Sequence, residues 1–354
     1  MKLRSKMKKL VNRLIGFVLL IGIIVLCAKY VSEPSVPPIL LKTHVLQDMY
    51  TLAGTKDLAI TSLKGGMSGS NLYKVDGKDS SYVIRLLGNC RSTESKAREV
   101  LVQTIASQEG WGPKLYASDI DEGWIIMEYI KPTPLTESDR MNDETYISLG
   151  QRLQQIHTGP EFLSVRDRLK EIKERLDRLY KENKIPQSID YEVLKNIIDL
   201  VKKHGSTVLA PTHRDLNPNN IIFSNHQPFI IDFEDAAQDD PFYDLGTIGI
   251  FYIFNTHHEE VFLKAYFNRV PTQQEYMRYQ RMKQLALIAY GLNFLNFAPQ
   301  EVIANVSVPL EPFEKLLQDF DKGVIDINNS TDQLRLAVSL LQEAINQYRK
   351  TVEI

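Results

Sequence analysis

The apolar positions of this 354-residue chain follow two different periods. Between about residue 44 and Ile130 they form short runs rich in β-branched and aromatic residues, separated by glycine and aspartate turns. Such runs predict β-strands. Apolar residues at helical spacing over Ser92–Gln108 predict one helix before the last of these strands. The four predicted strands are Ala59–Leu63, Leu72–Val75, Tyr82–Leu87 and Trp124–Tyr129.

Beyond Pro132 and Pro134 the helical period dominates. It predicts helices over Asp143–His157, Phe162–Asn183 and Tyr191–His204, and further helices as far as Tyr348. A strand-rich insert, Leu209–Asp232, interrupts them. We therefore expect an α+β chain with a small antiparallel-sheet N-lobe at 44–130 and a large, mostly helical C-lobe at 131–354.

The N-terminus differs from the rest in composition. Six basic residues within 2–13 precede the uncharged run Leu14–Ala28, and prolines 34, 37 and 38 follow. We expect residues 1–30 to form a basic segment and membrane anchor, with a hydrophobic helix at 10–28 contacting a lipid bilayer, and 31–43 to form a Pro-rich linker. The run is at the short end for a spanning helix. A signal peptide has the same order of charges and apolar residues, but no clean small-x-small cleavage site follows here.

Bulk composition excludes several classes. With 43% hydrophobic and 24% charged residues the chain is typical of a folded globular protein. Its net charge of −2 gives no basic field that would favour nucleic acid. The two cysteines have neither metal-ligand spacing nor a disulfide framework.

The candidate chemistry lies in the strand-rich insert. His213, Asp215 and Asn220 have the spacing H-x-D-x-x-x-x-N, and Asp232 ends the next apolar run. Two strands joined by a tight turn would place Asn220 beside Asp232, giving an amide oxygen and a carboxylate for Mg²⁺. Asp215 is then a separate carboxylate for an acceptor hydroxyl, so the set meets the needs of phosphoryl transfer. The alternative is that these are polar turn residues.

Three upstream features fit the same chemistry. The loop Gly65–Asn71 lies between two predicted strands, where it could cover phosphates, although a plain Gly-Ser turn is the alternative. Arg85 in the third strand could meet the phosphates and pair with Glu99 on the following helix, with Glu94 as the rival partner. The segment 126–130, which joins the lobes, would lie against adenine.

These motifs together resemble the choline/ethanolamine kinase and aminoglycoside phosphotransferase superfamily, which is related in fold to protein kinases. The resemblance covers roughly residues 60–300. It rests on His213-x-Asp215-x₄-Asn220, on Ile231-Asp232-Phe233-Glu234 and on the element from Asp240 to Gly246. The choline/ethanolamine branch is most similar. Gly-Gly-Met-Ser opens the phosphate loop, and Arg85 stands in the strand position where protein kinases have a lysine. The loop is one residue longer than usual, and Arg214 follows His213 as in protein kinases.

The resemblance implies a two-lobed protein-kinase-like fold that uses ATP and Mg²⁺. Asp215 would be catalytic, Asn220 and Asp232 would hold the metal, and His213 and Asp244 would support the catalytic loop. The residues implied in nucleotide binding are Gly65, Gly66, Ser68, Arg85, Glu99, Glu128 and Ile130.

The implied acceptor is a small molecule with a hydroxyl, most similar to choline or ethanolamine. Aromatic faces suit a quaternary ammonium, although an aromatic stripe at helical spacing is also typical of a core. The candidates for its pocket are Glu234, Tyr243, Tyr290, Phe294 and Phe297. The alternatives are an aminoglycoside or other small-alcohol kinase, and a membrane-anchored pseudokinase scaffold. His157 is expected to be structural, and the other histidines outside the motif, at 44, 204, 226, 257 and 258, are expected at the surface.

The anchor and the ATP requirement conflict. Basic residues before the apolar run predict that the N-terminus lies on the cytosolic side. If the run spanned the membrane, the catalytic domain would lie on the opposite side, away from cytosolic ATP. Because ATP is needed, we expect a membrane-associated protein whose catalytic domain faces the cytosol.

Overall fold

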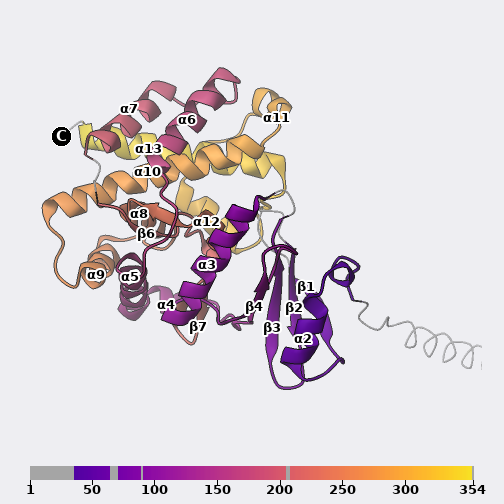
Figure 1. Cartoon of the computed structure of the whole chain (residues 1–354). Helices are drawn as coiled ribbons and strands as arrows, with labels where there is room; N and C mark the ends of the chain where they lie inside the picture. The colour runs from indigo at the N-terminus through magenta and orange to yellow at the C-terminus, as the bar shows by residue number, and fades with distance from the viewer. Residues whose placement is uncertain (1–35, 64–70, 89–90, 205–207, 353–354) are drawn as a thin grey trace, which may run out of the picture.

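The computed structural model describes residues 36–63, 71–88, 91–204 and 208–352. Two lobes are visible in Figure 1, a small sheet-containing N-lobe and a larger helical C-lobe. The predicted mixed α+β architecture is therefore confirmed. The predicted hydrophobic helix at 10–28 and the Gly65–Ser70 part of the phosphate loop lie outside the described residues.

The N-lobe sheet is antiparallel, with the strand order β1-β2-β3-β5-β4. Its central strand, β3, is buried from Tyr82 to Leu86. Leu115–Asp119 was not predicted as a strand, because it is an edge strand that pairs only with β5 and has a register shift after Leu115. The strands are β1 (Ala59–Leu63), β2 (Asn71–Asp76), β3 (Ser81–Leu86), β4 (Leu115–Asp119) and β5 (Trp124–Glu128).

A helix that the sequence did not predict, α2 (Val45–Ala53), shares the core of this sheet. Its buried residues Val45, Leu46 and Met49 join Ile60, Val75 and Ile84 in one cluster. The predicted linker ends in a 3₁₀ turn, η1 (Leu40–Lys42), and Leu40 is fully buried in the same cluster. The second half of this segment is therefore packed against the N-lobe.

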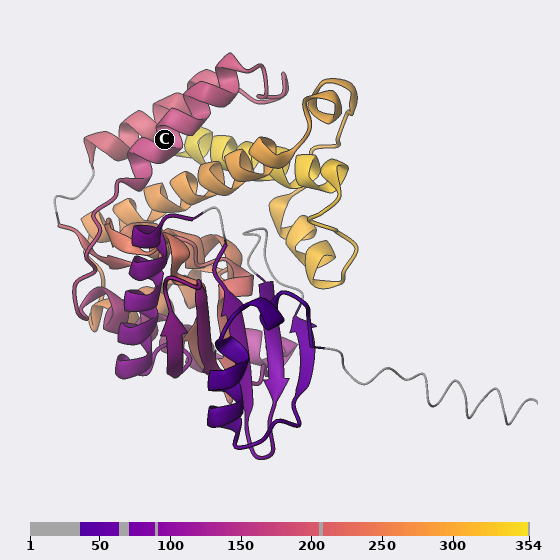
Figure 2. The same cartoon turned by 45° about the vertical axis from the view of Figure 1, so that its right-hand side comes forward.

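The predicted helix between the strands is α3 (Thr93–Glu109). The side chain of Ser92 accepts a hydrogen bond from Ser95 N at its start, and Gly110 ends it in the left-handed conformation. Figure 1 shows α3 between the sheet and the helices of the C-lobe, and Figure 2 shows the two lobes turned by 45°. One face of α3 therefore reaches the segment that follows Asp232.

The C-lobe is built around the long helix α10 (Gln273–Phe297), which packs against α6, α7, α8 and α13. The predicted helix at 162–183 begins six residues late, because Arg166 N bonds Gln238 O and Gln238 N bonds Ser164 O instead of continuing a helix. The other helices are α4 (Glu137–Arg140), α5 (Asp143–His157), α6 (Arg168–Lys181), α7 (Tyr191–Lys203), α8 (Phe242–Phe251), α9 (Thr256–Phe267), α11 (Gln300–Asn305), α12 (Phe313–Asp321) and α13 (Ser330–Val352).

Two small ladders interrupt the helices. β7 (Ile221–Ser224) pairs with β8 (Gln227–Ile230) across the turn residues Asn225 and His226, which both have positive φ, as a tight hairpin requires. β6 (Ala210–Thr212) pairs with β9 (Ala237–Asp239), which was not predicted. The short 3₁₀ turns η2 (Pro218–Asn220) and η3 (Phe233–Asp235) flank the hairpin.

Among the described residues, no helix combines the length and apolar character needed to cross a membrane.

Candidate active site

The β7–β8 hairpin brings Asn220 and Asp232 together, as its spacing predicts. Ile230 pairs with Ile221, and Ile231 N donates to Asn220 O at 3.0 Å, so Asp232 follows the residue opposite Asn220. Asp232 has φ 67° and ψ 68°, the left-handed region that side chains other than glycine seldom adopt. This turn directs the chain from β8 into η3. An unusual backbone conformation is often retained where a functional side chain must be placed.

Asp215 is held by three side chains. Tyr290 Oη donates to Oδ1 at 2.7 Å, Asn217 Nδ2 donates to Oδ1 at 3.1 Å, and Asn220 Nδ2 lies 3.2 Å from Oδ2. Asn220 Nδ2 also donates to the main-chain oxygen of Asp215 at 2.8 Å. The carboxylate is thus oriented but not sealed off, since Asp215 keeps intermediate exposure. Asn217 was not predicted as a partner of Asp215.

The loop before Asp215 is braced from below by Asp244, which is fully buried. One oxygen of Asp244 accepts from His213 N at 2.7 Å and the other from Arg214 N at 2.8 Å. His157 Nε2 lies 3.2 Å from Asp244, and His213 Nε2 lies 2.9 Å from Ile231 O. The position of Asp244 under the catalytic loop and the structural position of His157 are therefore as expected.

Arg85 connects the two lobes. Its guanidinium lies 2.8 Å from Glu99 and 2.6 Å from Asp232, so it pairs with Glu99 on α3 rather than with Glu94. Burial alone would lower the pKa of Arg85, but the charges of Glu99 and Asp232 outweigh it and raise that pKa. Because the side chain is only 5% exposed, it is not a solvent-facing strand residue.

Arg91, which was not predicted, forms a second bridge. It contacts Glu99 closely and lies 3.4 Å from Glu234, and its Nη2 donates to Ser95 Oγ at 3.0 Å. Glu234, a candidate for the acceptor pocket, thus lies on the phosphate side of the site. Burial and the neighbouring Asp232 raise the pKa of Glu234 to about 7. The sequence did not indicate these contacts, because an arginine just before a helix, as Arg91 is, has no characteristic partner.

The donor set suits Mg²⁺. An amide oxygen from Asn220 and carboxylates from Asp232 and Glu234 are the hard oxygen ligands that this ion prefers. Burial, and then the charge of Asp232, raise the pKa of Glu234, and a divalent cation beside the two carboxylates would offset both effects. The residues therefore fit the metal that the fold implies.

A second ionic cluster, also unpredicted, lies under the catalytic loop. Arg214 is fully buried between Glu171 at 2.6 Å and Asp239 at 2.8 Å, and Arg168 pairs with Asp235 at 2.8 Å. Arg168 also lies over the ring of Tyr243, 5.0 Å from its centroid. Tyr243 is 2% exposed, so the structure places this acceptor candidate beneath the site. Burial raises the pKa of Tyr243 to about 12.

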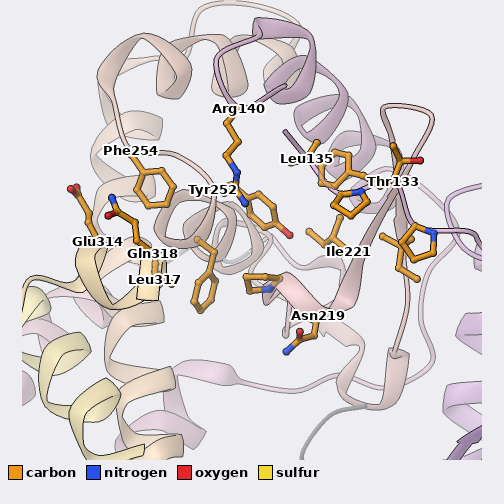
Figure 3. Close-up of a pocket in the computed structure, with 16 residues that line it drawn as sticks. Thr133, Leu135, Arg140, Asn219, Ile221, Tyr252, Phe254, Glu314, Leu317 and Gln318 are labelled. Atoms are coloured by element: carbon orange, nitrogen blue, oxygen red, sulfur yellow. The ribbon is translucent and has the colours of Figure 1, made fainter. Parts of the chain in front are cut away.

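A cavity of about 520 Å³ lies next to the catalytic loop, between the segment after β5, the β7 strand, the end of α8, and α12 (Figure 3). Pro218 and Asn219 of η2 line it, close behind Asp215. Phe251 also lines it and packs edge-on against Tyr290, with ring centroids 4.9 Å apart. The other lining residues are Pro132, Thr133, Pro134, Leu135, Arg140, Ile221, Ile222, Phe223, Tyr252, Phe254, Glu314, Leu317 and Gln318.

The remaining aromatic candidates lie elsewhere on α10. Phe294 packs against the C-lobe core and the small cluster around Leu316, and Phe297 is 51% exposed. Neither lines the cavity. Of the predicted acceptor aromatics, only Tyr290 contacts Asp215.

The segment linking the lobes is fixed at both ends. Glu128 accepts a hydrogen bond from Lys114 N at 3.2 Å, and Thr133 N donates to Phe223 O at 2.7 Å. Ile130 is buried between them. Gly65, Gly66 and Ser68 lie outside the described residues.

One histidine prediction was wrong. His258, expected at the surface, is 4% exposed because it sits in the first turn of α9 against Tyr146.

Solved structures of similar shape come from several kinases. A choline/ethanolamine kinase family protein from Mesorhizobium loti is 18% identical with a TM-score of 0.57, over 82% of this chain and 92% of that chain. The choline kinase LicA from Streptococcus pneumoniae is 20% identical with a TM-score of 0.55, over 86% and 99%. The aminoglycoside phosphotransferase APH(2'')-Ib in its ADP-bound form is 14% identical with a TM-score of 0.52, over 82% and 98%. At these identities the likeness shows the fold.

A search of curated proteins gave no significant match. The family model for the phosphotransferase enzyme family matches residues 59–279, which span the strand of Arg85, the loop of Asp215 and the β7–β8 hairpin. With that match, this chain belongs to the phosphotransferase enzyme family.

Proposed function

We propose that this protein transfers the γ-phosphoryl group of ATP to the hydroxyl of a small amino alcohol, choline or ethanolamine. The observation that carries the proposal is the set of contacts of Asp215. It bonds Asn220, the neighbour of Asp232, on one side, and on the other it bonds Tyr290, which packs against Phe251 of the cavity wall. A carboxylate so placed can orient an acceptor hydroxyl on one side and face the phosphates on the other.

The residues have separate tasks in this reaction. Asp215 orients the acceptor hydroxyl and accepts its proton as the bond to phosphorus forms. Tyr290 and Asn217 keep the carboxylate in one orientation. Arg85 supplies positive charge to the phosphates, with Glu99 fixing its fork. When Mg²⁺ is bound, Asn220 and Asp232 supply oxygen ligands and the ion offsets phosphate charge.

The use of ATP is supported by the fold and by its neighbours. The aminoglycoside phosphotransferase with the same fold was solved with ADP, and LicA was also solved with AMP. In this proposal the Arg85–Glu99 pair and the β7–β8 hairpin supply the groups that would face the phosphates.

The lining of the cavity supports an amino alcohol over an aminoglycoside. Aromatic rings from Phe223, Phe251, Tyr252 and Phe254 lie on its wall. Its charged lining residues are one carboxylate, Glu314, and one cation, Arg140. Aromatic faces with one carboxylate suit a single ammonium group, whereas a polyamine sugar would need several acidic partners.

The decisive experiment offers choline, ethanolamine and an aminoglycoside to the full chain with ATP and Mg²⁺. ATP consumption is measured, and the phosphorylated product is identified by ³¹P NMR. We expect turnover with an amino alcohol, and a loss of about 10²- to 10⁴-fold in kcat for Asp215→Asn. Full activity in that variant would remove Asp215 from its role. Turnover with the aminoglycoside alone would favour the alternative acceptor class, and no turnover with any acceptor would favour a scaffold role.

The acceptor pocket is tested by a matched pair of variants. Phe254→Leu removes an aromatic face from the cavity at similar volume, and Phe297→Leu makes the same change at the exposed end of α10. We expect Phe254→Leu to raise the KM for choline by about 3- to 10-fold, as loss of a cation–π contact would, with the KM for ATP unchanged. A larger effect from Phe297→Leu would move the pocket to the α10 stripe.

We further propose that residues 10–28 attach the protein to a lipid bilayer, with the catalytic domain on the cytosolic, ATP-containing side. The support is the basic segment followed by the uncharged run Leu14–Ala28. Flotation with liposomes should retain the full chain and lose a variant without residues 1–35. Protection of the C-lobe from added protease in sealed inside-out vesicles, whose outer surface is the cytosolic face, would overturn the cytosolic placement.

A further inference from the structure

Three potential metal ligands meet at one end of a helix pair, away from the catalytic loop. Asp143 is the first residue of α5, and His257 and His258 lie in the first turn of α9. The two helices run in parallel, since Asp143 contacts His257 at one end and His157 contacts Tyr266 at the other. Figure 1 shows α5 and α9 side by side in the C-lobe. The phosphotransferase chemistry makes no use of this cluster.

The spacing of the ligand atoms suits a small tetrahedral ion. His257 Nε2 lies 2.9 Å and His258 Nε2 3.8 Å from Asp143 Oδ1, and one ligand atom from each residue falls within 4.8 Å of the others. Bonds of about 2.0–2.2 Å to Zn²⁺ put tetrahedral ligands about 3.3–3.6 Å apart. The two measured distances lie on either side of that range. Small side-chain movements would therefore close the site around the ion.

One ligand is already fixed in place. The His258 ring stacks on Tyr146 with centroids 4.0 Å apart and an interplanar angle of 18°, and the residue is 4% exposed. Asn255 Oδ1 accepts from His258 N at 2.8 Å and caps α9. His257 is exposed and can rotate, so the entry path and an open coordination position lie on its side.

We infer that Asp143, His257 and His258 bind a divalent transition-metal ion of the Zn²⁺ type, with water in the fourth position. Two imidazoles and one carboxylate favour zinc over Mg²⁺, which prefers oxygen ligands. The ion links the first turns of α5 and α9. Since the far end of α5 carries His157 against Asp244, the link stabilises the helix pair behind the catalytic loop.

Two features of the site weaken the binding of a cation. Both helices present their partly positive N-terminal ends here, which Asp143 only partly offsets. Asn255 Nδ2 lies 2.9 Å from His258 Nδ1. An imidazole that binds metal through Nε2 carries its proton on Nδ1, so it needs an acceptor at that position. In the native chain the Asn255 amide must turn to provide one.

The need for an acceptor at His258 Nδ1 can be tested with a single substitution. Asn255→Asp supplies a carboxylate that can cap α9 and also accept the Nδ1 proton, which completes a carboxylate–histidine–metal arrangement. We expect it to tighten Zn²⁺ binding by about 10-fold or more. Asn142→Asp is the matched control, because it adds the same charge at the neighbouring cap of α5, where Asn142 accepts from Glu144 N and not from a histidine. It should change the affinity far less.

The experiment uses the full chain, purified without a polyhistidine tag, and titrates it with Zn²⁺ by calorimetry and with Co²⁺ by visible absorption. We expect one ion per chain, the absorption bands of tetrahedral Co²⁺, a rise in Tm with Zn²⁺, and no competition from Mg²⁺. His257→Ala and Asp143→Asn should each lose most of the binding. Both change residues that are not deeply buried, and their circular dichroism should match the native chain.

Three results would overturn the inference. They are Zn²⁺ binding that survives His257→Ala, an Asn255→Asp variant that binds no more tightly than Asn142→Asp, and no Zn²⁺ binding by the native chain at all. Mg²⁺-dependent phosphoryl transfer by the His257→Ala variant should equal that of the native chain, so this test succeeds or fails independently of the proposed kinase activity.

Discussion

Asp215 receives its hydrogen bonds from side chains that come from distant parts of the sequence. Asn217 and Asn220 belong to its own loop, whereas Tyr290 lies 75 residues away on α10. Burial, and then the charge of Asp215, raise the pKa of Tyr290 well above its usual value, so its hydroxyl stays a donor at neutral pH. The orientation of the carboxylate is therefore a property of single residues that tertiary packing brings together.

Removing this donor should slow catalysis without affecting the nucleotide site. We expect Tyr290→Phe to lower kcat by about 3- to 10-fold, because the loss of one hydrogen bond of about 1 kcal/mol loosens the carboxylate. The KM for ATP should not change, and both constants come from a steady-state assay with the identified acceptor. Tyr279→Phe is the control. Tyr279 is buried on the same helix, but its hydroxyl lies near Glu259 and not near Asp215. Equal effects of the two variants would contradict the role of Tyr290.

Replacing one oxygen atom of Asp244 by nitrogen should destabilise the protein. Both of its oxygens accept main-chain N–H groups in a site without solvent. Asp244→Asn would turn one acceptor into a donor that faces an N–H group, and we expect a loss of about 3 kcal/mol in the free energy of unfolding. Urea denaturation measures this loss. A change below about 1 kcal/mol would mean that the loop does not depend on this brace.

At the scale of elements, α10 links the site to the rest of the C-lobe. It begins with a capping box, in which Thr272 and Glu275 exchange hydrogen bonds, and Glu275 also pairs with Arg269 at 2.7 Å. The hydrogen bond from Arg269 is the largest influence that lowers the pKa of Glu275, to about 2. The start of the helix that carries Tyr290 is thus fixed by a charged side chain.

This pKa predicts how stability depends on pH. A carboxylate whose pKa is lowered in the folded state stabilises the fold above its unfolded pKa of 4.5, and the contribution is lost as pH falls toward 2. Glu275→Gln should therefore be less stable than the native chain at pH 7, by under about 1 kcal/mol, because the partner side chain Arg269 is exposed and water screens the pair. The difference should shrink below pH 4.5. Urea denaturation at several pH values measures it, and a difference that grows on acidification would contradict the assignment.

At the scale of the molecule, the lobes are joined by charge pairs as well as by the chain. Arg85 and Arg91 come from the N-lobe, and Asp232 and Glu234 from the C-lobe, with Glu99 of α3 between them. In the proposed reaction ATP binds between the lobes, so the distance between them would decide how the phosphates are held. Among these five charged residues, Arg91 is the one that the sequence motifs did not indicate.

Loss of Arg91 should loosen this junction. We expect Arg91→Gln to raise the KM for MgATP by about 3- to 10-fold, because Glu99 and Glu234 lose a shared partner, and to increase hydrogen exchange in η3. Arg98→Gln removes the same charge from α3 outside the Arg85–Arg91–Glu99–Glu234 cluster and should leave both measurements near the native values. If the two variants behave alike, Arg91 contributes only charge and not position.

The sequence by itself determined the local geometry of the site. A two-residue turn between two apolar runs is enough to place Asn220 opposite the residue before Asp232, since the register of a hairpin follows from its turn. The resemblance of the motifs to the family, and not their spacing alone, implied the ion pair of Arg85 with Glu99 and the brace at Asp244. The periods of apolar residues were sufficient for the α+β architecture and for the helices α3, α5, α6 and α7.

Tertiary structure decided the rest. The short strands β4 and β9 exist because a partner strand satisfies their hydrogen bonds, and the start of α6 was displaced by the pairing of residues 164–166 with Gln238. Contacts such as Tyr290 with Asp215, Arg91 with Glu234 and His258 with Tyr146 join residues separated by 75, 143 and 112 positions. Local pattern carries no information about such pairs, because only the packing of whole elements brings their side chains within reach.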